Sequence, residues 1–212
     1  MSAIETREKI LNTTMELLRE RNGDISNVTI RMIADRAGIG VGLTNHYFKT
    51  KDCLVSECVD AVFKDIFMAF MNMDEHAEGR TASPLEATKR AARQVMHFLL
   101  DNEAIARAAI TADVSAPGTE DYTTRLVNSF AYCMADRRQL DEMLSNDRMS
   151  DRMKQQFKEH FISEQRRKAF MIVSSIKEVF IRREFMFLTI GVDLSDSDKC
   201  DEYIDELVEM LM

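Results

Sequence analysis

The sequence predicts an all-α protein of about nine helices. Only 2 prolines and 7 glycines interrupt its 212 residues, fewer turn-forming residues than a β-sheet protein of this size needs. Apolar residues make up 45% of the chain, and they recur at the three- and four-residue steps that are typical of helices with one buried face. We therefore expect long helices joined by short connections around a substantial core.

The first fifty residues are expected to form three helices. Asn22-Gly23 ends the first helix, because both residue types tolerate left-handed backbone. Thr29 provides an N-cap for the second helix, and Gly38 stops it. The predicted ranges are 5–21, 30–37 and 41–48.

The remaining residues are also expected to be mainly helical. Ser83-Pro84-Leu85-Glu86 has the form of a capping box with proline at the first helical position. A polar loop is expected over 76–82, an extended segment over 185–192, and a final cap at Ser195 or Ser197. The predicted helices are 51–73, 84–101, 103–114, 119–144, 148–184 and a last one that ends near residue 211.

Targeting and redox signals point to a soluble cytoplasmic protein. The first ten residues are rich in charge and lack the apolar stretch of a signal peptide. No apolar run approaches the roughly 18 residues that a membrane helix requires. The cysteines are scattered, as expected for reduced thiols packed within helices: Cys53, Cys58, Cys133 and Cys200.

No pattern of catalytic or metal-binding residues stands out. The chain lacks a glycine-rich phosphate loop, an HExxH motif and a GxSxG motif. The segment 193–198 is similar to the opening of a calcium loop, but it lacks the central glycine and the glutamate at position twelve, so helix capping explains it better. We expect no catalytic residue, no metal and no cofactor.

Charge is distributed unevenly along the chain. The formal net charge is −8, and residues 1–52 carry +1 while residues 53–212 carry −9. A nucleic acid would be repelled by the acidic part, but phosphate contacts are local and need only the first part. The asymmetry permits a nucleic-acid-binding head on an acidic body without proving one.

Residues 29–48 have the pattern of a helix-turn-helix. Ala34 is small where the second helix is expected to cross, and Gly38 reverses the chain with a positive φ. The residues expected to anchor the second helix are Ile39, Leu43 and Phe48. The residues expected on or near its outer side are Gly40, Val41, Gly42, Thr44, Asn45, His46 and Tyr47.

Such an outer face suits the major groove of DNA. Asparagine bonds adenine with two hydrogen bonds, and threonine or valine contacts the methyl group of thymine. Tyr47, Lys49 and Lys51 suit phosphates. Two short helices around a glycine also occur in unrelated proteins, but here a supporting helix precedes them and the segment Tyr47–Leu54 follows.

These segments resemble the TetR family of regulators. The family's T-x-x-x-I-A-x-x-A-G-V-s turn is similar to Thr29–Ile39, and its H/Y-F-x-x-K-x-x-L exit is similar to Tyr47–Leu54. The resemblance is concentrated between about residues 7 and 54, a quarter of the chain. Many members have a Ser or Thr where Gly40 stands and an aromatic residue where Asn45 stands. These two departures weaken the cap of the second helix and suggest that Asn45 contacts a base and not a phosphate.

The resemblance implies a homodimer, an operator with two half-sites, and a helical body that binds a small molecule and then releases DNA. It implies a head over 1–52 and a ligand-binding and dimerisation domain over 53–212. By position, backbone contacts are implied for Thr29, Arg31, Tyr47 and Lys51, and base contacts for Val41, Gly42, Asn45 and His46, with Thr44 also expected at the DNA surface.

The body offers candidates for a ligand pocket and for a dimer face. Its 15 methionines and 12 phenylalanines suit either ordinary core packing or an adaptable apolar pocket. The dimer face is expected within about residues 150–212. The pocket candidates are Phe63, Phe67, Phe70, Met71, Met96, Phe98, Phe130 and Met134.

The favoured hypothesis is a cytoplasmic, ligand-responsive repressor that binds a palindromic operator as a homodimer. One alternative is a helical small-molecule-binding protein or enzyme that retains a helix-turn-helix. Another is a DNA-binding regulator without an inducer. The sequence leaves open activation in place of repression, and it names neither the inducer nor the operator.

Overall fold

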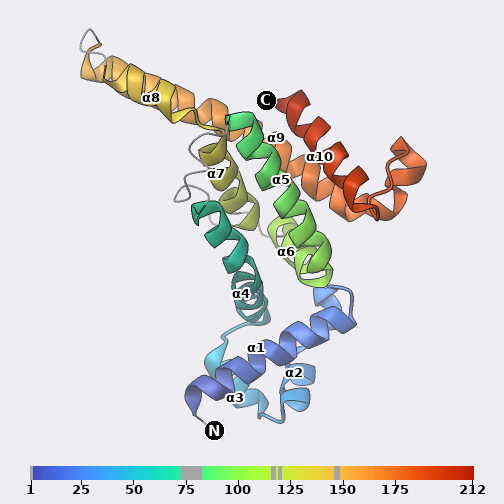
Figure 1. Ribbon diagram of the computed structural model, residues 1–212. Coiled ribbons are helices and arrows are strands. Elements are labelled where there is room, and N and C mark those ends of the chain that lie inside the picture. The colour runs from blue at the N-terminus through green and yellow to red at the C-terminus, as the bar shows by residue number, and fades with distance from the viewer. Residues whose placement is uncertain (1, 73–82, 116–117, 119–120, 146–148) are drawn as a thin grey trace. The chain divides into compact units, whose positions relative to one another are not determined.

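The computed structural model of the chain describes residues 2–72, 83–115, 118, 121–145 and 149–212 (Figure 1). Within these residues there are ten α-helices and one short 3-10 helix, with no strand, so the predicted all-α class is confirmed. The polar loop predicted at 76–82 lies outside the described residues. In chain order the elements are α1 (Ala3–Glu20), η1 (Ile25–Asn27), α2 (Ile30–Ala37), α3 (Val41–Tyr47), α4 (Lys51–Asn72), α5 (Pro84–Asp101), α6 (Glu103–Ser115), α7 (Tyr122–Met134), α8 (Arg137–Leu144), α9 (Asp151–Ile190) and α10 (Ser197–Leu211).

Contacts between residues divide the chain into two compact units. The first comprises Met1–Ile66 and Phe98–Gly118, and the second comprises Phe67–His97 and Thr119–Met212. Helix α6 therefore groups with α1, α2, α3 and most of α4. The predicted boundary at residue 52 separates a DNA-binding head from a ligand-binding and dimerisation domain by expected function, and it stays a prediction.

Helix α1 begins with a complete capping box. The Ser2 hydroxyl accepts a hydrogen bond from the Glu5 backbone N–H, and the Glu5 carboxylate accepts one from the Ser2 N–H at 2.7 Å. The Thr14 hydroxyl donates to the Ile10 carbonyl at 2.7 Å, so it is buried without losing a hydrogen bond. The buried face of the helix consists of Thr6, Ile10, Thr13, Thr14, Leu17 and Leu18.

The end of α1 lies against the start of α6 in the first unit. Asn22 has a φ of 50° and Gly23 a φ of 77°, which confirms the predicted left-handed ending. A Cβ atom added to Gly23 would lie 2.2 Å from the Ala104 carbonyl oxygen and 2.9 Å from the Arg107 Cβ. Glycine is therefore required here for two reasons, the backbone conformation and the close approach of α6.

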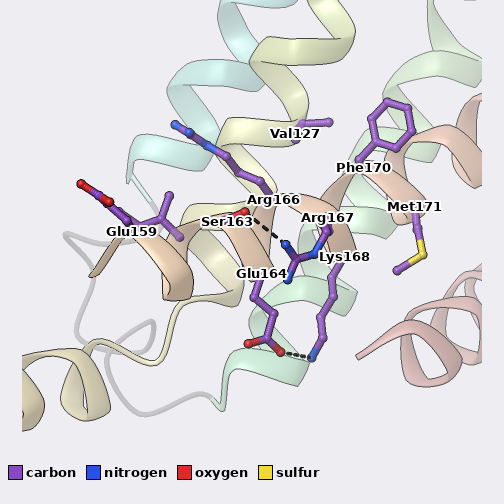
Figure 2. Close-up of a pocket in the computed structure, with 10 residues that line it drawn as sticks. Val127, Glu159, Ser163, Glu164, Arg166, Arg167, Lys168, Phe170 and Met171 are labelled. Carbon is purple, nitrogen blue, oxygen red and sulfur yellow. Dashed lines mark hydrogen bonds and ion pairs between the residues drawn. The ribbon is translucent and has the colours of Figure 1, made fainter. Parts of the chain in front are cut away.

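The second unit is organised around the 40-residue helix α9, which packs against α7, α8 and α10. An open, mainly apolar groove of about 910 Å³ lies along α9 and α7 (Figure 2). Val127 of α7 and Phe170 of α9 lie at one part of this groove, and Arg166 and Glu159 lie at another. The buried residues of α9 are Phe161, Ala169, Ile172, Val173, Ile176, Val179, Phe180 and Met186.

Two predictions about this unit were wrong. Residues 185–190 are helical and not extended, because α9 continues to Ile190 before Gly191, whose φ is 77° and whose N–H donates to the Phe187 carbonyl at 3.0 Å. Extending an existing helix adds one backbone hydrogen bond per residue, which outweighs the weak strand preference of a short apolar run.

The predicted helix over 119–144 is in fact two helices. Ala135 adopts extended backbone, with φ −70° and ψ 118°, between α7 and α8. The two helices pack on α9 separately. No glycine or proline marks the break, and the only local signal is Asp136, a residue type that favours helix N-caps, directly before α8.

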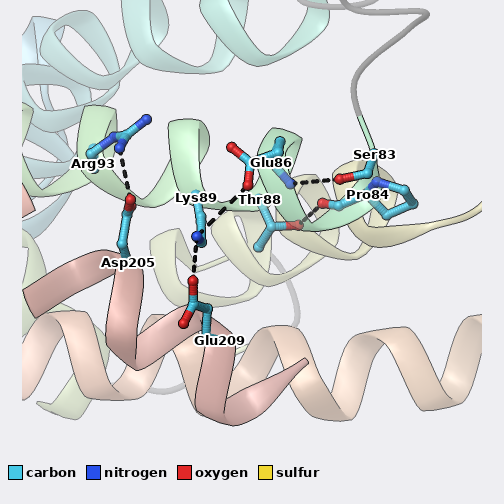
Figure 3. A network of polar contacts seen from close by, with 8 residues as sticks. All are labelled: Ser83, Pro84, Glu86, Thr88, Lys89, Arg93, Asp205 and Glu209. Carbon is cyan, nitrogen blue, oxygen red and sulfur yellow. Dashed lines mark hydrogen bonds and ion pairs between the residues drawn. The ribbon is translucent and has the colours of Figure 1, made fainter. Parts of the chain in front are cut away.

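Two ion pairs and one hydrogen bond of a histidine connect α5 and α10 in the second unit. Lys89 Nζ lies 2.5 Å from Glu209 Oε1, and Arg93 Nη1 lies 2.9 Å from Asp205 Oδ2 (Figure 3). His97 continues the same face of α5, with Nε2 2.7 Å from Asp201 Oδ1. Both helices place these residues four apart, so the pairs fix the rotation of antiparallel α10 even though single surface pairs add little stability.

Local caps start both of these helices. The Ser83 hydroxyl accepts from the Glu86 N–H at 3.2 Å, with Pro84 at the first helical position, which confirms the predicted start of α5 (Figure 3). The cap of α10 is Asp196, which accepts from the Asp198 and Lys199 N–H groups. The predicted caps Ser195 and Ser197 were therefore each wrong by one residue.

The cysteines are all free thiols, as predicted. Burial raises the pKa of Cys58 to about 12 and that of Cys200 to about 11, with nearby carboxylates adding to both shifts. These two thiols are therefore unreactive at neutral pH. Among the helices of the described residues, none combines the length and the apolar character that crossing a bilayer requires.

We predict that Gly23→Ala destabilises the protein more than Gly38→Ala does. Both residues have positive φ, but a Cβ at Gly38 meets no atom within 4 Å whereas one at Gly23 meets the α6 backbone. The expected loss in the free energy of unfolding is about 1 kcal/mol for Gly38→Ala and about 3 kcal/mol for Gly23→Ala. Urea denaturation measures both, and equal losses would contradict the close contact with α6.

Candidate DNA-binding surface

The turn between α2 and α3 follows the predicted pattern. The Thr29 hydroxyl accepts from the Met32 N–H at 3.2 Å to cap α2, and Gly38 has a φ of 63° at its end. The Ile39 N–H donates to the Ala34 carbonyl at 2.9 Å, which closes the turn. The buried residues of α2 are the three predicted ones, Ile33, Ala34 and Ala37.

An ion pair holds α2 on α1. Arg36 Nη1 lies 2.7 Å from Glu20 Oε1 and Nη2 lies 3.1 Å from Oε2, a two-pronged pair. The pair raises the pKa of Arg36 and lowers that of Glu20, chiefly through the hydrogen bond between their side chains. Arg36 is therefore occupied within the protein and is a poor candidate for a phosphate contact.

Helix α3 is rotated from the predicted orientation. Thr44 is fully buried and Phe48 is 1% exposed, whereas Leu43 is 45% exposed. The predictions that Thr44 faces outward to DNA and that Leu43 anchors the helix were wrong. The Thr44 hydroxyl donates to the Gly40 carbonyl of its own helix at 3.3 Å, so this polar side chain is buried with its donor satisfied.

The outer face of α3 contains the other predicted base-contacting residues. Val41, Gly42, Asn45 and His46 are all exposed. Leu43 joins them, and sequence reasoning missed it because a leucine in a short helix is expected inside. A signal was available, since residues 44 and 48 are four apart and therefore share one face of a helix.

The end of α3 is more closely packed. Tyr47 is half-buried, and its ring meets that of His46 edge to face with centroids 5.7 Å apart. Gly40 provides no side-chain hydrogen bond as N-cap, as expected from its missing hydroxyl. Helix α3 is thus held by its turn and by buried Thr44 and Phe48, with no side-chain cap at its N-terminus.

Exposed groups that suit phosphates flank this face. Thr29, Arg31 and Lys49 are exposed. Lys51 is half-buried, and its Nζ donates to the Ile25 carbonyl at 2.9 Å, so it also ties η1 to the start of α4. The contacts of these residues with DNA stay predictions.

The pocket candidates fall into three groups. In the first unit, the rings of buried Phe63 and half-buried Phe98 meet edge to face with centroids 4.9 Å apart. In the second unit, three candidates are buried: Met96, Phe130 and Met134. The side chains of Phe67, Phe70 and Met71 lie outside the described residues.

The acid-rich turn before α10 has a structural role. The Asp193 carboxylate accepts from the Ser195 hydroxyl at 2.6 Å and from the Ser195 N–H at 3.0 Å, and Asp196 caps α10. These hydrogen bonds lower the pKa of both aspartates. Across the described part of the chain, no group of three or more His, Cys, Asp or Glu residues is placed to hold a metal ion.

The comparison with known proteins identifies the class. Residues 10–58 match the family described as "Bacterial regulatory proteins, tetR family". These residues therefore form a helix-turn-helix domain of the kind that this family carries. A match to a family of regulatory proteins agrees with the prediction that the chain is not an enzyme.

Relatives support this placement over a larger part of the chain. It is 29% identical over 146 residues to the HTH-type transcriptional repressor KstR of Rhodococcus jostii (strain RHA1), covering 66% of this chain and 65% of that repressor. It is 31% identical over 136 residues to KstR of Mycobacterium tuberculosis, covering 62% of this chain and 59% of that repressor. The chain thus matches less than two thirds of the length of these relatives.

A solved structure shows the same fold. The crystal structure of a TetR transcriptional regulator from Rhodococcus sp. RHA1 superposes with a TM-score of 0.56 at 18% sequence identity, covering 100% of this chain and 98% of that chain. The helices of the described residues therefore have the fold of this regulator.

We predict opposite outcomes for two neighbouring residues of α3. Thr44→Val keeps the buried volume and leaves DNA affinity within about twofold, since Thr44 is inaccessible. Asn45→Ala, at an exposed position, loses about tenfold or more, as expected for an amide that reads adenine. Fluorescence anisotropy with a selected DNA site measures both affinities, and a larger loss for Thr44→Val would contradict the observed rotation of α3.

Proposed function

We propose that this protein is a transcriptional repressor that binds a palindromic operator as a homodimer and is released by a small-molecule inducer in the cytoplasm. The observation that carries the proposal is the exposed face of α3, which the Gly38 turn and buried Thr44 and Phe48 hold away from the protein. The names of the KstR relatives support repression over activation.

In this proposal α3 enters the major groove and the flanking groups position it. Arg31 and Lys49 are exposed and suit phosphates, and Thr29, Tyr47 and Lys51 are the further candidates. Residues 53–212 carry a charge of −9, so phosphates attract only the head. The two heads of a dimer would lie about 34–36 Å apart, one turn of the double helix.

Exposed apolar side chains on the C-terminal helices support a dimer. Large exposed apolar residues of this kind are costly in water unless a partner covers them. Two of them, Phe170 and Met171, also line the groove along α7 and α9 (Figure 2). The residues are Met153, Phe170, Met171, Phe185, Phe187, Leu188, Ile190 and Met210.

The proposed inducer site is in the body, and its ligand is unknown. Aromatic and methionine side chains adapt to apolar ligands, and Phe63 with Phe98 provides one such aromatic pair. The ligand-free form is the one that binds DNA, because a ligand that prefers another conformation shifts the population away from it. A regulator without an inducer is the alternative.

A binding assay on DNA from upstream of the protein's own gene tests the function, and salt dependence tests the head. We predict that Lys49→Ala weakens binding and reduces the slope of log affinity against log salt by about 2, one phosphate for each head. For Arg36→Ala, the slope of log affinity against log salt is expected to equal that of the wild type, because Arg36 is paired with Glu20. Equal slopes for wild type and Lys49→Ala would contradict this phosphate contact.

We also predict that Leu188→Glu disrupts the dimer. Leu188 is 81% exposed on α9, and a carboxylate introduced there would lose its hydration when the proposed interface forms. Val114→Glu is the control, since Val114 is 74% exposed but lies on α6 in the first unit. Sedimentation velocity is expected to show monomers for Leu188→Glu only, and a dimeric Leu188→Glu protein would place the interface elsewhere.

A further inference from the structure

No backbone strain or close contact within the protein explains why residue 42 of α3 is a glycine. It is not among the glycines with positive φ, and a Cβ added to it would meet no atom within 4 Å. Glycine within a helix is less favourable than alanine by about 1 kcal/mol. Glycine at such a position allows another surface to approach the backbone closely, so the reason for Gly42 is to be sought outside the chain.

Gly42 has an apolar residue on each side of it in the sequence. Val41 is 40% exposed and Leu43 is 45% exposed. Helix α3 contains no Lys, Arg, Asp or Glu, and it therefore lacks the side chains that most often read guanine or accept from cytosine. The exposed side of α3 thus has an apolar side chain on each flank, with Gly42, one amide, Asn45, and one imidazole, His46, as its other exposed residues.

Only one group on the base edges of the major groove is apolar, the C5 methyl of thymine. A valine or leucine that meets it removes apolar surface from water on both sides and leaves no polar group unpaired. An apolar partner protein would also suit exposed side chains, but the basic residues Arg31 and Lys49 flank this face and favour a polyanion.

We propose that Val41 and Leu43 read thymine methyl groups in each half-site of the operator, with Gly42 letting the helix approach the base edges closely. Asn45, one turn from Val41, reads an adenine nearby. This inference rests on the proposed function and specifies it: the operator half-site carries thymines opposite α3, and their methyl groups contribute to affinity.

The test replaces each thymine of a selected operator with deoxyuridine, which removes only the methyl group. The operator is obtained by selection of random DNA with the full-length protein. We expect the affinity of the wild-type protein to fall about fourfold for each contacted methyl removed. With Leu43→Ala or Val41→Ala, the same replacement at the matching thymine is expected to change affinity by less than twofold. Both side chains are exposed, so these variants fold.

Lys49→Ala is the matched control. It is expected to lower affinity for both DNAs while leaving the thymine-to-uridine ratio as in the wild type, because Lys49 is assigned to a phosphate. Gly42→Ala provides a second measurement, in which stability and DNA affinity are expected to change in opposite directions. It is expected to raise the melting temperature and to weaken operator binding about tenfold, because its methyl group occupies the space of close approach.

The outcomes separate this inference from the proposed function. A wild-type protein that selects no DNA sequence overturns the proposed function and the inference with it. Specific binding that is insensitive to uridine at every position overturns the inference alone. Sensitivity that persists in both Val41→Ala and Leu43→Ala also overturns it, because the methyl groups are then read by other residues.

Discussion

The left-handed backbone at Gly38, with a φ of 63°, sets the direction in which α3 leaves α2. The Ile39 N–H closes this turn on the Ala34 carbonyl, so the angle between the two helices is fixed by the backbone itself. Thr44 and Phe48 then fix the rotation of α3 about its own axis by filling the space beneath it. Angle and rotation together decide which side chains face outward, and the proposed DNA recognition depends on both.

Different kinds of contact stabilise the two units. In the first, Gly23 brings the end of α1 against the backbone of α6, a contact that leaves no room for a side chain. In the second, α9 buries an apolar face while charged pairs such as Arg93 with Asp205 align α5 and α10. Close backbone contact specifies position strictly, whereas paired charges specify rotation at little gain in stability.

The charge of the chain affects how a head of this kind would gain specificity. A net charge of −8 disfavours non-specific attachment to DNA, which depends mainly on phosphates. The exposed face of α3 has no formal charge of its own, and Arg36 is neutralised by Glu20. Under the proposed function, a larger share of the binding free energy therefore comes from base edges, which is favourable for selecting one sequence among many.

The sequence by itself determined the all-α class, the helix-turn-helix and the caps, because Thr29, Gly38 and Ser83 act on backbone groups within three residues of themselves. Helix rotation and helix ends depended on distant packing. Tertiary structure placed Thr44 inside and Leu43 outside. It also ended helix α7 at Ala135, where the sequence has no glycine or proline. The same nonlocal packing groups α6 with the first unit, and no local pattern records which surfaces a folded chain brings together.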